Sequence, residues 1–419
     1  MQHERAVLGE IEVMGKLGLI LSKALAFIYV FLLNISKKKK KVTSGKILII
    51  AAGHMGNAIM DIDAICALKD FYKGKNKMVY LLCALPLWKT FQAIGDMTDF
   101  IYMEHVYPYQ GNGTDLRNVH RTISKVRQHE FEEILVTLNN APLAHYVVAA
   151  SSCNKSWGVF DNVKHTHGSL RYYFEKKYTD KIYVPVDLHE TQRLKMLLKE
   201  IGVKDYHVRI HHIKKSVAYA LPNRPYITIA MDSMSTERRW PRENYTELVH
   251  VLLDRYPYDI CCTGGEVANE IYEYCAKGLP DTGRFHNYAG KTGMKEWFEL
   301  IRGAALHIGV DSGSIHVAAS VGTQAISLSG VWDGKRCLPY DVDIENENTC
   351  QPVCVYRNDI DIKELSCYAC KVYGGRSGRG NNECYKQCRK GGTCLCLKNI
   401  SVGTVVHTVE LCLNKGGRV

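Results

Sequence analysis

The residues best placed to do chemistry follow an apolar run, Ala304–Val310, that reads as a buried strand. Asp311, Ser312 and Gly313 come directly after it, and His316 falls in the first turn of the short helix that should follow. Asp or Ser can cap such a helix, and Gly lets the backbone approach a ligand. The free amides and positive end of the helix favour an anion such as a phosphate. A capped helix with an incidental histidine is the structural alternative.

A second loop, residues 231–245, follows the expected strand Tyr226–Ala230 and has the sequence MDSMSTERRWPRENY. Ser235 and Thr236 offer hydroxyl groups, and Arg238 offers a guanidinium. Hydroxyl groups and a guanidinium after a strand suit a diphosphate. A solvated loop held by a buried Trp240 would give the same pattern.

A third loop, A-A-G-H-M-G-N, contains Gly53 and Gly56 and lies between the apolar run Lys46–Ala51 and an amphipathic stretch. This arrangement predicts a strand, a glycine loop and a helix in succession. A dinucleotide-dependent oxidoreductase would need the fuller pattern G-x-G-x-x-G. The loop lacks the first glycine of that pattern, so the sequence argues against an oxidoreductase.

The elements that position these loops repeat along the chain. Apolar runs alternate with helical stretches, which predicts parallel sheets covered by helices. The expected strands are 46–51, 78–83, 100–103 and 133–138 in one half, and 226–230, 259–263, 304–310 and 324–328 in the other. The fold class is therefore α/β, with two Rossmann-like domains facing a cleft that suits a ligand.

The predicted organisation has four parts. Residues 1–44 form a membrane-associating segment, 45–215 and 222–345 form the two Rossmann-like domains, and 346–419 form a Cys-rich insert with a C-terminal helix. Nine Lys and Arg residues stand against three Glu residues within the first 46, so much of the net charge of +11 belongs to the amino terminus. A nucleic-acid binder should instead carry a basic stripe on a folded domain.

The membrane prediction rests on residues 17–35, LGLILSKALAFIYVFLLNI, which Lys37–Lys41 follow. A full span wants about 20 apolar residues, so this segment could cross a bilayer or lie in its interface. A disordered tail without membrane association is the alternative. Lysines after an apolar run tend to stay on the cytoplasmic side and are attracted to anionic lipid. We therefore expect the chain at the cytoplasmic face of the inner membrane.

Eight of the sixteen cysteines fall in one segment of the expected insert. They are Cys350, Cys354, Cys367, Cys370, Cys384, Cys388, Cys394 and Cys396. Eight thiolates are enough for two tetrahedral zinc sites, and a metal would stabilise a segment with little apolar content. The spacing is less regular than in a zinc ribbon, so free thiols of a cytosolic protein are the alternative.

Three D-x-D pairs also occur, at Asp61/Asp63, Asp341/Asp343 and Asp359/Asp361. A pair that binds a divalent cation should follow an apolar strand. The first pair falls inside an expected helix and the other two in acidic, loop-like sequence. We interpret all three as solvated carboxylates.

Taken together, these motifs resemble the ADP-heptose:lipopolysaccharide heptosyltransferase family, glycosyltransferase family 9. The matching pieces occur in the order of the family over roughly residues 46–410. They are GHMGN, the loop ending in RRWP, DICCTGG, YAGKTGMKEWFELIR and GVDSGSIHVAASVGT.

The resemblance implies a GT-B fold and a metal-independent, inverting sugar transfer that requires no cofactor. The second domain would hold a nucleotide-diphosphate sugar, and the first a lipopolysaccharide or other lipid-linked glycan. Asp311, Ser312, Gly313 and His316 would contact the nucleotide and its phosphates. Arg238 stands where the family commonly has a phosphate-binding Lys.

One position departs from the family. Asn57 stands where the family usually has an Asp taken as general base, and an amide cannot accept a proton at neutral pH. Asp61 lies one helical turn later on the same face and could replace it. Two alternatives remain: Asp61 only solvates its helix, or the chain is a weak or inactive member that still binds a nucleotide sugar.

Overall fold

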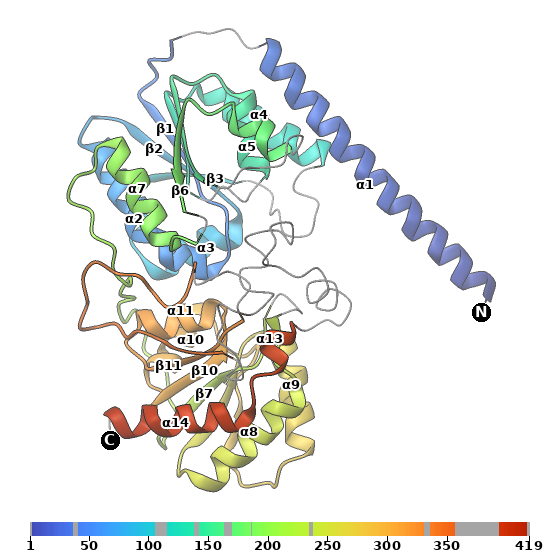
Figure 1. Ribbon diagram of the computed structural model, residues 1–419, viewed down its shortest axis with the longest axis vertical. Helices are drawn as coiled ribbons and strands as arrows, with labels where there is room; N and C mark the ends of the chain where they lie inside the picture. The colour runs from blue at the N-terminus through green and yellow to red at the C-terminus, as the bar shows by residue number, and fades with distance from the viewer. Residues whose placement is uncertain are drawn as a thin grey trace.

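The computed structural model describes residues 2–36, 41–104, 115–137, 142–162, 170–185, 187–233, 238–330, 336–356 and 394–416. Two six-stranded parallel sheets form two domains that stack along the long axis of the molecule, as Figure 1 shows. A long helix, α1 (Gln2–Ser36), lies beside the first domain and projects away from it toward the amino terminus. The predicted α/β fold with two Rossmann-like domains and an apolar N-terminal helix is confirmed.

The first sheet has the strand order β3-β2-β1-β4-β5-β6. Its strands are β1 (Lys46–Ile50), β2 (Met78–Cys83), β3 (Phe100–Glu104), β4 (Glu133–Val136), β5 (Lys155–Asp161) and β6 (Asp180–Val184). The side chains of β1 alternate between two cores, because successive residues of a strand point to opposite faces. Ile47 and Ile49 pack against helices α2 (Met55–Lys73), α3 (Leu85–Ile94) and α7 (Glu190–Ile201). Leu48 and Ile50 pack against α4 (Leu116–His129), α5 (Pro142–Ala150) and α6 (Leu170–Glu175).

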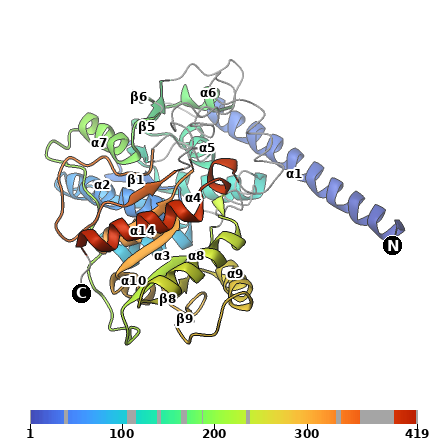
Figure 2. The same cartoon turned by 60° about the horizontal axis from the view of Figure 1, so that its bottom comes forward.

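The second sheet has the same topology, because its strand order read from the β9 edge is β9-β8-β7-β10-β11-β12. Its strands are β7 (Tyr226–Ala230), β8 (Asp259–Thr263), β9 (Phe285–Asn287), β10 (Leu306–Val310), β11 (Ala325–Leu328) and β12 (Val353–Val355). One face is covered by α8 (Arg242–Arg255), α9 (Glu266–Lys277), α13 (Leu395–Lys398) and α14 (Val402–Gly416). Figure 2 shows α8 and α14 lying side by side on this face.

The other face of the second sheet joins the two domains. Helices α10 (Met294–Arg302) and α11 (Gly313–Ser320) share one apolar core with α2 and α3 of the first domain. Helix α11 contacts α2, and α10 contacts α3. The strand order changes direction between β1 and β4 in one sheet and between β7 and β10 in the other, and ligands of such sheets bind beyond the carboxyl ends at those points.

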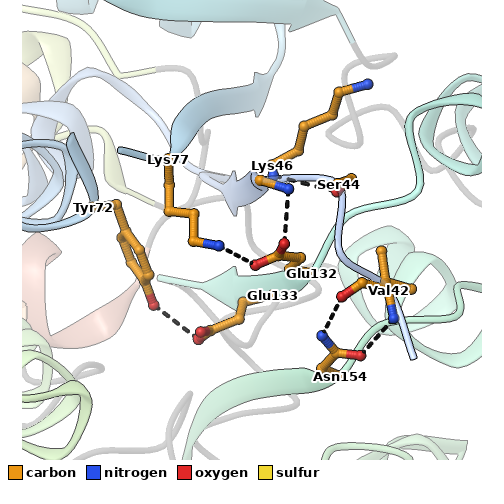
Figure 3. A network of polar contacts seen from close by, with 9 residues as sticks. Val42, Ser44, Lys46, Tyr72, Lys77, Glu132, Glu133 and Asn154 are labelled. Atoms are coloured by element: carbon orange, nitrogen blue, oxygen red, sulfur yellow. Dashed lines mark hydrogen bonds and ion pairs between the residues drawn. The ribbon is translucent and has the colours of Figure 1, made fainter. Parts of the chain in front are cut away.

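The chain between α1 and β1 is tied to the first domain by a polar network, shown in Figure 3. The Asn154 amide bonds to both backbone groups of Val42, donating to its carbonyl at 2.7 Å and accepting from its N–H at 2.9 Å. Glu132 accepts from the Gly45 N–H and from the Lys77 ammonium, each at 2.7 Å. Residues 42–45 are therefore fixed in place, just after the lysine run.

Candidate active site

The glycine loop places its polar residues at the amino end of α2. The Asn57 side-chain oxygen accepts the N–H of His54 at 3.1 Å and so satisfies one donor at the start of the helix. A Cβ on Gly53 would lie 2.6 Å from the Cβ of Asn57, which leaves no room for a side chain there. Asn57 thus has a local structural role in addition to any role in catalysis.

The first turns of α2 and α11 meet at the junction of the two domains. A Cβ on Gly56 would lie 2.7 Å from Cδ2 and 3.1 Å from Nε2 of His316. A Cβ on Gly313 would lie 3.1 Å from the Cβ of Met55. Two glycines, one from each domain, therefore let the amino ends of two helices come together. The glycine loop and the loop after β10, two of the three loops identified in the sequence, lie here.

Helix α11 begins at an N-cap, Ser312, whose side chain makes no capping hydrogen bond. Two neighbouring helices have their amino ends occupied by carboxylates. Asp232 accepts the Gly265 N–H at 2.8 Å at the start of α9, and Glu296 accepts the Gly293 N–H at 2.7 Å at the start of α10. A helix end whose N-cap side chain makes no capping hydrogen bond can bind an anion, as the sequence predicts for α11.

His316 is buried and electrically neutral. Burial, with His189 and Arg238 nearby, lowers the pKa of its imidazole to about 3. Its Nδ1 lies 2.6 Å from the Tyr340 hydroxyl. Burial raises the pKa of the Tyr340 phenol, so this hydroxyl keeps its proton and can donate it to Nδ1. In the tautomer that accepts this bond at Nδ1, the ring proton is on Nε2, on the side that faces Gly56.

Arg238 extends from the loop after β7 to the end of β10. Its guanidinium Nη1 lies 3.5 Å from the carbonyl oxygen of Asp311. Trp240, two residues later, is buried, and its indole N–H donates to the Ile400 carbonyl at 3.1 Å. The buried tryptophan that the sequence analysis gave as a structural alternative is thus present. It holds a loop that also brings Arg238 to Asp311. Ser235 and Thr236 lie outside the described residues.

Asp61 is buried, with 2% of its surface exposed, so it does not solvate its helix. Burial raises the pKa of this carboxyl well above its usual range, and the negative charge of Glu190 raises it further, although a hydrogen bond with Thr137 opposes both. Its Oδ1 has no hydrogen-bond partner within the described part of the chain. Asp61 and Thr137 belong to the amino half of α2 and the carboxyl end of β4, close to the strand-order change.

A cluster of buried charges adjoins Asp61 and crosses between the domains. Glu190 forms ion pairs with Arg336 and Arg193, and Arg193 bonds to Asp161 at 2.8 Å. Two guanidinium groups thus face three carboxyls when Asp61 is included. The cluster is electrically neutral when one of these carboxyls carries a proton, which agrees with the raised pKa of Asp61.

The interpretation of the D-x-D pairs as solvated carboxylates is wrong for the first pair. Asp63 pairs with His211 at 2.9 Å and with Arg209 at 3.1 Å, and Asp61 is buried. In the second pair, Asp343 accepts from Lys195 and from the Val208 N–H, each at 2.8 Å. The third pair, residues 359 and 361, lies outside the described residues.

The described half of the cysteine cluster consists of Cys350, Cys354, Cys394 and Cys396. Within the described ranges, no three His, Cys, Asp or Glu residues gather in a way that could hold a metal ion. Cys396 is instead part of the apolar core of the second domain. The other four, Cys367, Cys370, Cys384 and Cys388, lie outside the described residues, so the zinc site stays a prediction.

Several residues of this region have no signal in the sequence. Tyr340, Glu190 and Arg336 come from loops and helix ends far apart along the chain, and only the fold brings them to His316 and Asp61. Asp232 had a usable signal, because it lies two residues after a predicted strand, close to where ligand-binding side chains of parallel sheets are often found.

The raised pKa of Asp61 gives a signed prediction for stability. A carboxyl whose pKa is higher in the folded state is harmless below its unfolded pKa of about 3.9 and destabilises the fold increasingly as pH rises toward the folded pKa. Asp61→Asn and wild type should therefore melt at nearly the same temperature at about pH 4. By about pH 8 the variant should melt at a higher temperature than wild type. Differential scanning calorimetry across this range measures it.

Asp63→Asn is the matched control. Although burial opposes them, the hydrogen bond and charge of His211 and the charge of Arg209 lower the pKa of Asp63. This carboxylate stabilises the fold above its unfolded pKa and ceases to do so in acid, so Asp63→Asn should melt below wild type at neutral pH. Equal pH profiles for the two variants would contradict the assignment of Asp61.

Comparison with known proteins gives consistent matches. Residues 163–358 match the family description "Glycosyltransferase family 9 (heptosyltransferase)". The chain is 31% identical over 121 residues to lipopolysaccharide heptosyltransferase 3 of Escherichia coli, which is 28% of this chain and 35% of that protein. It is 32% identical over 95 residues to lipooligosaccharide heptosyltransferase 2 of Haemophilus influenzae, which is 22% of this chain and 27% of that protein. These matches span about a third of the length of each relative.

Solved structures share the fold over nearly the whole chain. A glycosyltransferase family 9 protein of Veillonella parvula superposes with a TM-score of 0.61 at 15% identity, over 90% of this chain and 100% of that one. E. coli ADP-heptose lipopolysaccharide heptosyltransferase II gives a TM-score of 0.56 at 15% identity, over 88% and 99%. The two parallel sheets are thus those of a GT-B fold, and residues 163–358 are similar in sequence to glycosyltransferase family 9.

Proposed function

We propose that this protein is an inverting glycosyltransferase. It moves a heptose or related sugar from a nucleotide-diphosphate donor to a lipopolysaccharide or another lipid-linked glycan. The observation that carries the proposal is the meeting of the amino ends of α2 and α11 through Gly56 and His316. The family match and the names of the relatives, which are heptosyltransferases, support the same reaction.

The donor diphosphate binds at the amino end of α11. The amides after Ser312 and the Nε2–H of His316 point hydrogen bonds at it, and the guanidinium of Arg238 adds a fixed positive charge. A neutral histidine suits this role when its Nδ1 accepts the Tyr340 hydroxyl, because the ring proton is then on Nε2 and can be donated to the diphosphate. Ser235 and Thr236, whose hydroxyl groups follow β7 in the sequence, complete the site in this proposal.

Asp61 is the general base. The acceptor hydroxyl attacks the anomeric carbon of the donor, the new carbon–oxygen bond forms, the bond to the diphosphate breaks, and the hydroxyl proton passes to the Asp61 carboxylate. A carboxyl with a raised pKa and an open Oδ1 suits proton acceptance near neutral pH. The departing diphosphate keeps its electron pair and is stabilised by the amino end of α11. Transfer needs no metal or other cofactor in this scheme.

The acceptor and the location follow from the same family relation. The first domain holds the lipid-linked glycan, so the enzyme works at the membrane surface, on the cytoplasmic face of the inner membrane. The apolar helix α1 belongs to that first domain and supports this location.

A second candidate is a weak or inactive member that binds a nucleotide sugar. It is favoured by one observation, that Asn57 occupies the family position of the base and uses its side chain to cap α2. The two candidates differ in turnover and agree on donor binding.

Donor binding tests the proposal first. Calorimetric titration with ADP, ADP-heptose, UDP-sugars and GDP-sugars should show selective binding by the wild type. Arg238→Ala should weaken it by about tenfold to a hundredfold, as expected for loss of a hydrogen bond to a charged group. Asp311→Ala should weaken it too.

Arg242→Ala is the matched control, because Arg242 is exposed and pairs with Glu243 on α8. It should bind as the wild type does. No binding of any nucleotide by folded wild-type protein would overturn the proposed function.

The base is tested by two amide–acid exchanges. Asp61→Asn should lower the transfer rate by about 10²- to 10⁴-fold without changing donor affinity. Asn57→Asp places a carboxylate at the family position and can still cap the His54 N–H, so it should restore part of the rate when combined with Asp61→Asn.

Asp63→Asn serves as the control for a nearby carboxyl that is paired with His211 and Arg209. Unchanged turnover in Asp61→Asn, together with a rate increase in Asn57→Asp alone, would replace the base assignment with the weak-member alternative.

A further inference from the structure

Helix α1 has one face built into the first domain. Ala26 and Val30 are fully buried in the core that α4, α5 and the sheet also form. The Ser22 hydroxyl accepts the Leu116 N–H at the start of α4 at 3.0 Å, and the Tyr29 hydroxyl lies 3.0 Å from Nδ1 of His120. Figures 1 and 2 both show this half of α1 alongside α4 and α5. The helix is therefore part of the folded domain and is not a separate tail.

The opposite face of α1 is apolar and exposed. We call it the outer face, and it consists of Ile20 (64% exposed), Leu21 (61%), Leu25 (43%), Ile28 (50%), Leu32 (53%) and Ile35 (62%). After Ile20, its members recur every three or four residues, so they form one stripe along the helix. A contiguous apolar surface of this kind on a soluble domain marks an interaction site.

Basic residues follow the outer face in the sequence and lie on the helix that packs against α1. Lys37–Lys41 follow its last residue by one position in the sequence, and Val42, which comes next, is tied to the domain by Asn154. Helix α4, which packs against α1, carries four Lys or Arg residues and no Asp or Glu between Leu116 and His129. Arg117 and Arg121 of this helix are exposed. An apolar stripe bordered by basic residues matches a bilayer with anionic headgroups.

We propose that α1 lies in the plane of an anionic bilayer surface, with its outer face in the headgroup boundary, and does not cross the membrane. The stretch Gly18–Ser36 has the length and composition of a span, but one of its faces is occupied by the domain. A crossing helix would have to leave that core, or carry the basic helix α4 into hydrocarbon. This inference rests on the proposed work at a membrane and adds the geometry of attachment.

A second copy of the chain is the competing occupant of the outer face, because three- and four-residue spacing also suits a paired helix. Two copies packed in parallel through this face would bring two runs of five lysines together, which is unfavourable. The charge therefore favours lipid over a second chain.

The same geometry determines which variant is informative. Deleting residues 1–44 would strip the apolar cover from α4 and α5, so loss of membrane binding could follow from damage to the fold. The triple variant Leu25→Gln, Ile28→Gln, Leu32→Gln changes only exposed side chains. Leu411→Gln, at an exposed leucine of α14 in the second domain, is its matched control.

Sedimentation with preformed vesicles tests the proposal. The full chain should bind vesicles containing phosphatidylglycerol, and bind vesicles of phosphatidylcholine alone much more weakly. The triple variant should lose binding by about tenfold or more, and the control should not. Replacing Lys37–Lys41 with serine should remove the dependence on phosphatidylglycerol and on salt. Unchanged melting temperatures and unchanged nucleotide affinity in the triple variant separate this test from that of the proposed function.

The side of the membrane on which the amino terminus lies distinguishes a helix α1 in the membrane surface from one that crosses the bilayer. An epitope tag placed before residue 1 should resist protease added to bacterial spheroplasts and be cut only after lysis. Cleavage in intact spheroplasts would show a crossing helix and overturn the proposal. So would equal vesicle binding by wild type and triple variant, or a wild-type dimer in sedimentation velocity that the triple variant breaks.

Discussion

The first turn of α2 packs directly against the first turn of α11, with Gly56 facing the His316 ring and Gly313 facing Met55. Backbone meets side chain so closely there that a methyl group on Gly56 would fall inside the contact distance of the ring. This contact fixes the position of the two sheets relative to each other, and it continues into an apolar core that α2 and α3 share with α10 and α11. It also brings the positive ends of two helices to one place, which is the physical basis of the proposed anion site.

Burial shifts the pKa values of the polar groups around that contact. It lowers the pKa of the His316 imidazole, and together with the charge of Glu190 it raises the pKa of the Asp61 carboxyl. Both groups have neighbours in the other domain, since His189 of the first domain lies near His316 and Arg336 of the second domain pairs with Glu190 beside Asp61. Opening the junction would hydrate these groups and alter their charges. We therefore regard domain contact and site chemistry as coupled.

Much of this arrangement could be predicted from local sequence. Buried strands of parallel sheets read as apolar runs, so β1, β2, β7, β8 and β10 were predictable, and β9 and β12, of three residues each, were too short to stand out. The three loops that supply Gly56, Arg238 and His316 follow such strands and were identified for that reason. Tyr340 and Glu190 were not predictable, because their roles arise from tertiary contacts. The sequence did not predict that Asp61 is buried. The apolar pattern of a helix indicates which face is covered, but it does not show how tightly a single polar residue on that helix is enclosed.

A crystal structure of the protein soaked or co-crystallised with ADP would show directly whether the amino end of α11, beside Gly56 and His316, holds the diphosphate of a nucleotide sugar. The diphosphate should lie at the Ser312–Gly313 amides, within hydrogen-bonding distance of the His316 Nε2, with the Arg238 guanidinium beside it. A diphosphate bound instead at the start of α9, displacing Asp232 from the Gly265 amide, would overturn the proposed donor site.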